Sequence, residues 1–232
     1  MSGIHELQKN GIAQLRQAMQ AAPVALKHPF PVRPRRMLGL IKFDGQVFSA
    51  EKLTRAVFLQ ITLPAFMKVF STFISPKVEY DLPVFTCEAV ALGAKRILII
   101  DAHAGGAGGE KRNDNFCDRL LDIRSRYPDL LRFQKKASSG IAALQSPAAL
   151  RVTIPRGLDD QANAVFADYF AAYLNLVNAA QPVSGIARAK LQASFDAYLK
   201  TVVDHDPGVK GNIMFFGKKE GVERALDMYY GV

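Results

Sequence analysis

The sequence contains no tryptophan, only two cysteines (Cys87 and Cys117) and no long apolar run. Two cysteines without a CxxC spacing provide no disulfide framework and are typical of a reducing compartment. An apolar run of roughly 20 residues would be needed to cross a membrane. The first residues, MSGIHELQKNGIAQLRQ, lack the apolar stretch of a secretory signal. We therefore expect a cytoplasmic protein that is not associated with a membrane.

Negative charge is also scarce, because 21 Asp and Glu face 30 Lys and Arg and leave a net charge of +9. A basic protein attracts nucleic acid, anionic membrane or an acidic protein through its long-range field. The basic residues are spread along the chain in small groups: Arg33, Arg35, Arg36; Lys111, Arg112; Lys135, Lys136; Lys218, Lys219. They lack the stacking aromatics of nucleic-acid binders, so nucleic acid is disfavoured. A solvated basic surface and an acidic protein partner remain as the two interpretations.

Apolar positions at helical spacing predict a helix over residues 3–22, and the prolines between 23 and 34 then make an extended connector. Residues 36–103 are typical of strands, in the segments MLGLIKF, QVFSA, AVFLQITL, MKVFSTFIS, LPVFTCEAVAL and RILIIDAHA. Asp44-Gly45, between the first two segments, predicts a two-residue hairpin turn. The links are too short for crossover helices, so the pattern predicts an antiparallel meander.

Helical spacing returns after the glycine-rich residues 104–109, over residues 112–126, 159–180, 186–203 and 220–230, with one further strand at 151–155. A sheet followed by helices predicts layers in which the helices cover the sheet. No change of composition marks a boundary, so we expect a single domain over residues 1–232.

Two motifs that invite a binding function are better explained by structure. GGAGGEK at residues 105–111 lacks the spacing of a phosphate-binding loop, because Arg112 stands where Ser or Thr is needed. Asp101 and His103 lie on one side of a strand end and could form a metal pair. The sequence offers no identifiable third ligand, so no metal site is predicted.

Glu88 lies in the otherwise apolar strand PVFTCEAVAL, where alternation puts it on one face with Val84, Thr86, Val90 and Leu92. A carboxylate on a buried face is costly unless it is paired or functional. The same pattern fits a sheet whose Glu88 face is solvated, and the residues alone leave both interpretations open. A second polar cluster, Asp204-His205-Asp206 before Pro207-Gly208, is typical of a helix end.

Two segments together resemble the ferredoxin-dependent bilin reductases. KVEYDLPVFTCEAVALGAKRILIIDAHA is similar to the central sheet segment of that family, and DHDPGVKGNIMFFGKKEGVERALDMYYGV is similar to its closing segment. YPDLLRF and LRVTIP fall in the right order between them. The resemblance implies an α/β fold, a three-layer α/β/α sandwich with a central antiparallel sheet. It also implies an enzyme that reduces biliverdin or a related linear tetrapyrrole. The enzyme would have no bound cofactor and would take its electrons from reduced ferredoxin. We expect it to be a monomer.

The same resemblance assigns roles to individual residues. Glu88 falls on the family's proton-donating acidic position, which is usually Asp, and Asp206 falls on a second acidic position. His205 lies beside Asp206, where the family often has Asn. Ser71 stands where the phycocyanobilin-forming enzymes have a catalytic His, and Gln60 stands near their additional Glu. Candidates for binding the bilin propionates are Arg151 and Arg156.

The departures from the family pattern keep two alternatives open. Red chlorophyll catabolite reductases resemble this chain in having Glu at the position of Glu88, which favours a chlorophyll catabolite as substrate. Ser71 and Gln60, in place of the family's catalytic residues, favour a bilin-binding protein without turnover.

Overall fold

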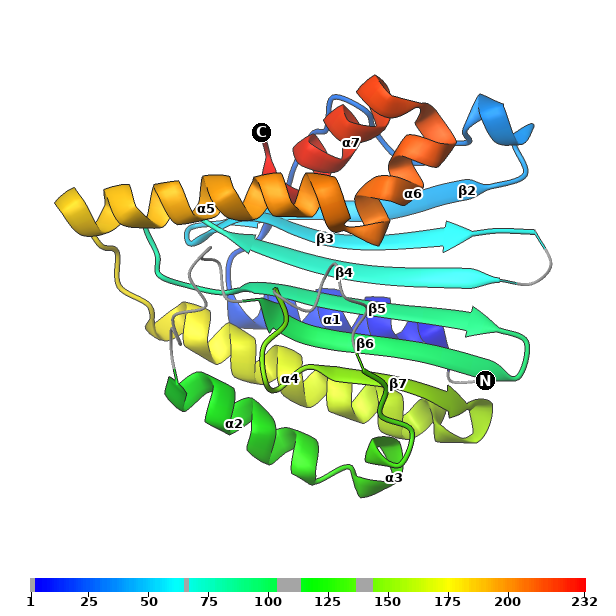
Figure 1. The fold of residues 1–232 in the computed structure, drawn as a ribbon, viewed down its shortest axis with the longest axis horizontal. Helices are drawn as coiled ribbons and strands as arrows, with labels where there is room; N and C mark the ends of the chain where they lie inside the picture. Colours follow the sequence, from blue (N-terminus) through cyan, green and yellow to red (C-terminus); the bar gives the residue numbers. More distant parts are fainter. Residues whose placement is uncertain (1–2, 65–66, 104–113, 137–143) are drawn as a thin grey trace.

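The computed structural model describes residues 3–64, 67–103, 114–136 and 144–232, and these form three layers (Figure 1). The middle layer is one sheet of seven strands that lie in the order in which they follow along the chain. Its strands are β1 (Ala22–Pro23), β2 (Lys42–Ala50), β3 (Leu53–Thr62), β4 (Lys68–Pro76), β5 (Val84–Leu92), β6 (Lys95–His103) and β7 (Leu150–Pro155). All neighbouring pairs are antiparallel, so the predicted meander is confirmed.

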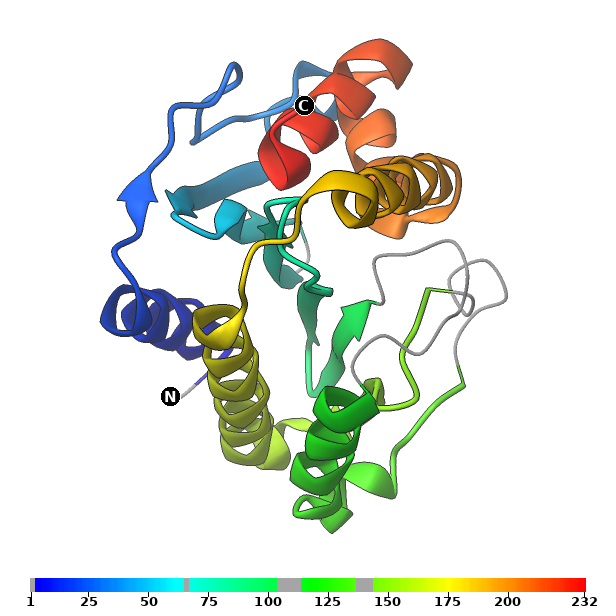
Figure 2. The same ribbon diagram turned by 90° about the vertical axis from the view of Figure 1, so that its left-hand side faces the viewer.

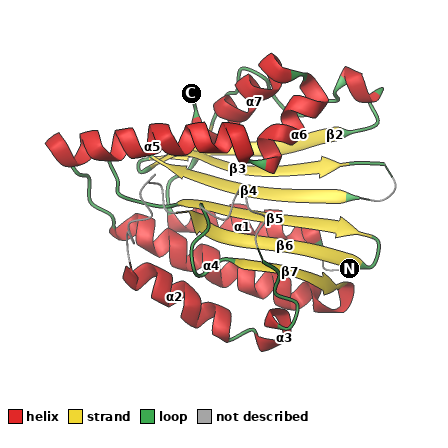
Figure 3. Ribbon diagram, in the orientation of Figure 1, coloured by secondary structure: helices red, strands yellow, loops and turns green. Residues whose placement is uncertain are grey.

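Helices cover both faces of this sheet (Figure 2). On one face lie α1 (Ile4–Ala18), α2 (Asp114–Ser125) and α4 (Asp159–Ala179), and on the other lie α5 (Gly185–His205), α6 (Pro207–Phe216) and α7 (Lys218–Tyr230). The short elements α3 (Pro128–Leu131), η1 (Arg35–Met37) and η2 (Arg156–Leu158) belong to the connections. The predicted three-layer α/β/α sandwich is therefore confirmed (Figure 3).

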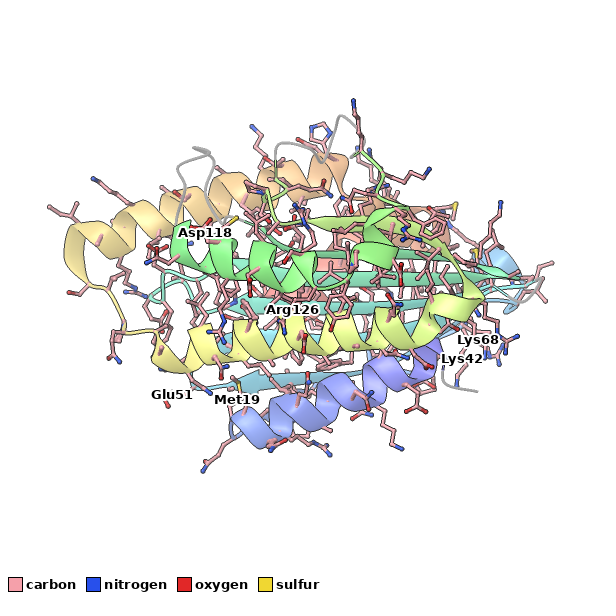
Figure 4. All side chains as sticks on the ribbon, turned by 90° about the horizontal axis from the view of Figure 1, so that it is seen from below. Met19, Lys42, Glu51, Lys68, Asp118 and Arg126 are labelled. Carbon is pink, nitrogen blue, oxygen red and sulfur yellow. The ribbon has the colours of Figure 1, made fainter. Side chains whose placement is uncertain are left out.

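The face of the sheet toward α1 and α4 is an aromatic and aliphatic core. Phe70 and Phe85 alternate inward from β4 and β5 and pack edge-on or tilted against Phe166 and Phe170 of α4, at ring-centroid distances of 6.1 Å and 5.3 Å for the pairs Phe70–Phe166 and Phe85–Phe170. Cys87 and Ala89 of β5 belong to the same buried cluster. Figure 4 views the molecule from this side, with α1, α2 and α4 across the sheet. Period-two alternation of apolar residues therefore explains this half of the core.

The face toward α5–α7 holds a second core, with a different composition. Val57 and Leu59 of β3 and Val84 of β5 meet buried residues of the C-terminal helices, among them Tyr198 and Met228. Polar side chains also occur on this face, on strands β4 to β7: Ser71, Glu88, Asp101, His103 and Arg151. Titratable groups on a sheet face beneath packed helices are typical of a functional site, so the candidate site is on this face.

The predicted hairpin turn at Asp44-Gly45 is wrong, because β2 continues through both residues to Ala50. The turn to β3 lies at Glu51–Lys52 instead. A Cβ atom at Gly45 would lie 2.8 Å from the backbone oxygen of Phe58 on β3. The glycine therefore permits a close approach of two strands rather than a turn.

Some expectations fall on residues outside the described part of the chain. The glycine-rich residues 104–109, the GGAGGEK segment and the start of the helix expected at 112 are among them. Within the described ranges, no helix is both long enough and apolar enough to cross a membrane. The single domain over residues 1–232 stays a prediction.

Candidate active site

Glu88 lies at the centre of the sheet, on the face toward the C-terminal helices. Its strand neighbours Cys87 and Ala89 point into the opposite core. In the register of the sheet, Glu88 is paired with Ser71 on β4 and with Ile99 on β6, and Ile99 is paired in turn with Arg151 on β7. Directly paired residues point to the same side of an antiparallel sheet. Ser71, Glu88 and Arg151 therefore form one row. Phe85, Cys87 and Ala89 face the core beneath α1 and α4, whereas Thr86, Glu88 and Val90 lie on the face toward the C-terminal helices and are partly exposed.

The surroundings of Glu88 favour its protonated form. Burial raises the pKa of Glu88 from 4.5 to about 7, and the negative charge of Asp206 adds to this shift, whereas the guanidinium of Arg151 opposes it. Desolvation penalises the charged carboxylate more than the neutral acid. A carboxylic acid with this pKa still holds its proton at neutral pH in a large fraction of molecules, as a general acid must.

Asp206 reaches the same site from the junction of α5 and α6. Its Oδ1 accepts hydrogen bonds from the backbone N–H groups of Gly208 (2.7 Å) and Val209 (3.0 Å), so it caps the N-terminus of α6. Burial raises the pKa of Asp206, while these two hydrogen bonds and the nearby His103 and Lys210 oppose the rise. Asp206 therefore lies at a helix end, as its sequence pattern indicates, and also belongs to the site around Glu88.

Tyr229 of α7 is a site residue that the sequence analysis did not identify. It is buried, its ring lies 4.9 Å from that of Phe73, and its phenol is hydrogen-bonded with the Ser71 side chain. Burial raises the pKa of Tyr229, and the negative charges of Glu88 and Asp206 raise it further. The phenol therefore stays protonated at neutral pH. In the sequence, Tyr229 is one of two adjacent tyrosines at a helix end, and nothing there distinguishes it from a core residue.

Three of the predicted site residues lie away from this site. Gln60 is paired with Phe70 and shares its face, so it lies on the opposite side of the sheet from Glu88. It lines a groove of about 520 Å³ between α1 and the β2–β3 hairpin. Arg156 is exposed in η2, beyond the end of β7. His205 is exposed at the last position of α5.

The structure does bring together four of the predicted residues: Ser71, Glu88, Arg151 and Asp206. Among the residues that the structure describes, no group of three or more His, Cys, Asp or Glu side chains is placed to hold a metal ion. The arrangement has two carboxyl groups of raised pKa, a phenol and a guanidinium between a sheet and a helical layer. It can supply protons to a ligand and can hold an anionic group of that ligand.

The sandwich fold and the two acids of raised pKa on one side of its sheet fit a protein that handles protons at this face, and comparison with known proteins identifies the family. The family model described as "Ferredoxin-dependent bilin reductase" matches residues 9–221. The chain therefore belongs to the ferredoxin-dependent bilin reductase family. The expectation of a ferredoxin-dependent bilin oxidoreductase is confirmed at the level of the family.

Individual relatives agree with this assignment. The chain is 26% identical to the phycoerythrobilin:ferredoxin oxidoreductase of Synechococcus sp. (strain RCC307) over 84% of this chain and 80% of the relative. It is 23% identical to the protein of that name from Gloeobacter violaceus over 83% and 80% of the two chains. The crystal structure of tomato phytochromobilin synthase in complex with biliverdin matches with a TM-score of 0.82 at 18% identity, covering 98% of this chain and 82% of that one. This last likeness supports the fold.

Proposed function

We propose that this protein reduces biliverdin or a related linear tetrapyrrole with electrons from ferredoxin, and that Glu88 and Asp206 provide the protons. The observation that carries the proposal is the pKa of Glu88, raised to about 7 on the sheet face toward the C-terminal helices, in a chain of this family. The family name supports ferredoxin as donor, and the tomato structure contains biliverdin.

Reduction of a conjugated tetrapyrrole adds one proton for each electron. A neutral tetrapyrrole accepts an electron poorly, and protonation of a ring nitrogen or a lactam oxygen makes it a better acceptor. Glu88 would donate this proton from its protonated form, become a carboxylate, and be stabilised as such by Arg151. Asp206 would donate at another stage. Each proton leaves a carboxyl group of the protein and each electron comes from ferredoxin, so no other reductant is required.

Arg151 has a second role in this proposal. A guanidinium binds a carboxylate through charge-assisted hydrogen bonds, and Arg151 is partly exposed on β7, in the same row as Glu88. It would bind a propionate of the bilin. Arg156 and His205, which are exposed outside the row, remain candidates for the rim of the site, and Gln60 would act only from the other face.

Anaerobic incubation with biliverdin and reduced ferredoxin tests the proposal directly. Binding should shift and sharpen the long-wavelength absorption of biliverdin, because a flexible chromophore becomes ordered. Product chromatography then identifies the reduced bilin. In the Glu88→Gln variant, binding should persist while reduction slows by about 100- to 10,000-fold, the usual contribution of a general acid. An unchanged spectrum of biliverdin at every protein concentration, or a wild-type rate in the variant, would contradict the proposal.

One observation favours a second candidate function. Ser71 lies beside Glu88 in the sheet, and Tyr229 of α7 is hydrogen-bonded with Ser71, so a hydroxyl and a phenol meet there, neither of which titrates near neutral pH. A carrier that binds a bilin without reducing it needs hydrogen-bonding groups of this kind. Spectral binding without turnover in the same assay would support the carrier. A substrate derived from chlorophyll would be indicated by turnover of that substrate but not of biliverdin.

A further inference from the structure

A basic surface with exposed apolar side chains lies where η1, α6 and α7 meet, outside the site around Glu88. η1 packs against α6, and in Figure 1 the blue segment before β2 lies beside the orange helix α6. Segments far apart in the sequence therefore build one surface, which we call the η1–α6 surface. Its defining side chains are all exposed: Arg35, Arg36, Leu38, Met214, Lys218 and Lys219.

The cations of the η1–α6 surface gather around Gly217, the residue that joins α6 to α7. A Cβ atom on Gly217 would lie 2.8 Å from Nη2 of Arg36, so the guanidinium lies against the backbone of this glycine. Lys218 and Lys219 follow directly, in the first turn of α7. The acid of that turn, Glu220, is hydrogen-bonded at 2.8 Å to an arginine of the same helix, so its negative charge is already matched. The surface is therefore positive.

Large apolar side chains are exposed at the same place. Leu38 is 88% exposed, Leu40 is 63% exposed and Met214 is 59% exposed. Among the described residues, six large hydrophobic side chains are exposed, and these are three of them. Exposed apolar side chains with a polar rim mark surfaces that bind a partner. The centre of a protein–protein interface is likewise apolar and its rim polar.

The loop that carries Leu38 is held in one conformation. Leu38 has a left-handed backbone (φ 51°), which is uncommon for a residue other than glycine. Its N–H donates to the Arg35 carbonyl (3.0 Å), and Nη1 of Arg33 donates to the Gly39 carbonyl (2.7 Å). These two hydrogen bonds keep the leucine directed away from the core. Strained backbone of this kind persists where the surrounding structure fixes it, and is frequent at binding sites.

Helix α6 connects the η1–α6 surface with the candidate active site. Asp206 caps its N-terminus, and Met214 lies in its last turn. A helix of ten residues is about 15 Å long. The far end of α6 is fixed to the sheet, because the ring of Phe43 on β2 lies 5.4 Å from that of Phe215 and 5.3 Å from that of Phe216. Electron transfer slows steeply with distance, so a protein that docks here is near enough to serve the site.

We propose that the η1–α6 surface is the docking site for reduced ferredoxin. Its cations attract the acidic surface of a ferredoxin and speed the encounter, and Leu38 and Met214 form the apolar centre of a small interface. In each encounter one electron passes from ferredoxin to the bound bilin, ferredoxin is left oxidised, and no atom is transferred. The proposal rests on the proposed function for the identity of the partner, which the family name supports.

Binding of oxidised ferredoxin in the absence of bilin tests the surface separately from the reaction. Surface plasmon resonance at several salt concentrations would compare the wild-type protein with Arg35→Glu/Lys218→Glu. We expect Kd to rise at least about tenfold, mainly through slower association, and its dependence on salt to weaken. The matched control is Arg188→Glu/Lys190→Glu, which makes the same change of net charge at two exposed cations near the start of α5. Its Kd should rise far less.

Leu38→Ser tests the apolar centre without a change of charge. It should speed dissociation of ferredoxin and leave the salt dependence of binding as in the wild-type protein. In turnover of biliverdin, both Leu38→Ser and Arg35→Glu/Lys218→Glu should raise the ferredoxin concentration that gives half the maximal rate. The rate at saturating ferredoxin and the affinity for biliverdin should match the wild-type protein, because neither variant touches the site around Glu88.

Several results would overturn this docking site. An equal loss of affinity in the two double variants would mean that net charge alone attracts ferredoxin. Wild-type affinity in both Arg35→Glu/Lys218→Glu and Leu38→Ser would exclude the surface, and so would loss of binding to phosphatidylglycerol vesicles in these variants while ferredoxin binding persists, which would assign the surface to a membrane. If ferredoxin binds as expected but the wild-type protein reduces no bilin, the proposed function fails and the docking site stands.

Discussion

The raised pKa of Glu88 predicts a dependence of stability on pH that can be measured without any substrate. In the unfolded chain the carboxyl group titrates at its ordinary pKa of 4.5, and in the folded protein at a pKa of about 7. Between these values the folded protein binds more protons than the unfolded chain. The contribution of Glu88 to stability is therefore fully present below pH 4.5 and is lost as the pH rises through about 7. Glu88→Gln removes this dependence because an amide does not titrate.

The size of the effect follows from the interval between the two pKa values, at about 1.4 kcal/mol for each unit. Most of that interval lies between pH 5 and pH 8, and Glu88 is partly exposed to water. We therefore expect the free energy of unfolding of Glu88→Gln, relative to wild type, to rise by about 2 kcal/mol from pH 5 to pH 8. At pH 8 the variant should be the more stable protein, although we expect it to reduce bilin far more slowly.

Urea unfolding at several pH values, followed by far-ultraviolet circular dichroism, measures this difference. Glu51→Gln is the matched control, because it makes the same substitution at an exposed carboxylate in the turn between β2 and β3 (Figure 4). Its stability relative to wild type should stay constant over the same range. Parallel pH curves for wild type and Glu88→Gln would refute the reasoning, since they would mean that Glu88 titrates alike in the folded and unfolded chains.

Three further predictions concern Asp206, the packing of α7 against α6, and the docking of ferredoxin. Asp206→Asn keeps the cap of α6 but removes a negative charge, so the pKa of Glu88 should fall below about 7 in a carbon-13 NMR titration; Asp206→Ala should cost about 1 kcal/mol of stability more than Asp206→Asn. Gly221→Ala would put a Cβ atom 2.6 Å from the Asn212 carbonyl oxygen on α6, and should destabilise the protein in urea by about 1–3 kcal/mol. Turnover at limiting ferredoxin should fall as salt rises, while bilin affinity changes much less. Turnover that does not depend on salt would show that the net charge of +9 does not serve ferredoxin docking.

The sheet was predictable because its strands alternate and its links are short. Both features are local, so the order of β2 to β6 follows from the chain alone. The turn predicted at Asp44-Gly45 was wrong because a glycine that permits a close approach to Phe58 cannot be distinguished in the sequence from a glycine in a turn. Helix α6 was missed because Pro207 and Gly208 suggest a turn, although an Asp followed by Pro at the first helical position is also a helix start.

The site was predictable only in part. Glu88 was identified by its contrast with an apolar strand and by the family resemblance, and Asp206 by the resemblance alone. How far the Glu88 face of β5 is covered could not be determined, because it depends on where α5–α7 pack. The phenol of Tyr229 lies beside Ser71 only after α7 docks on β4. A contact between residues so distant in sequence leaves no trace in local periodicity.

The order of the sheet also has a consequence for folding. Strands β2 to β6 pair only with neighbours in sequence, so their hairpins close over short loops, which makes their formation entropically inexpensive. Glu88 meets Asp206 only after the chain has returned through α4 and α5. The sheet can therefore assemble before the C-terminal helices dock, and the two acids come together late. Partial opening of α5–α7 would separate the acids and leave every strand pairing intact. The movement that completes folding is then the reverse of the one that would admit a large ligand.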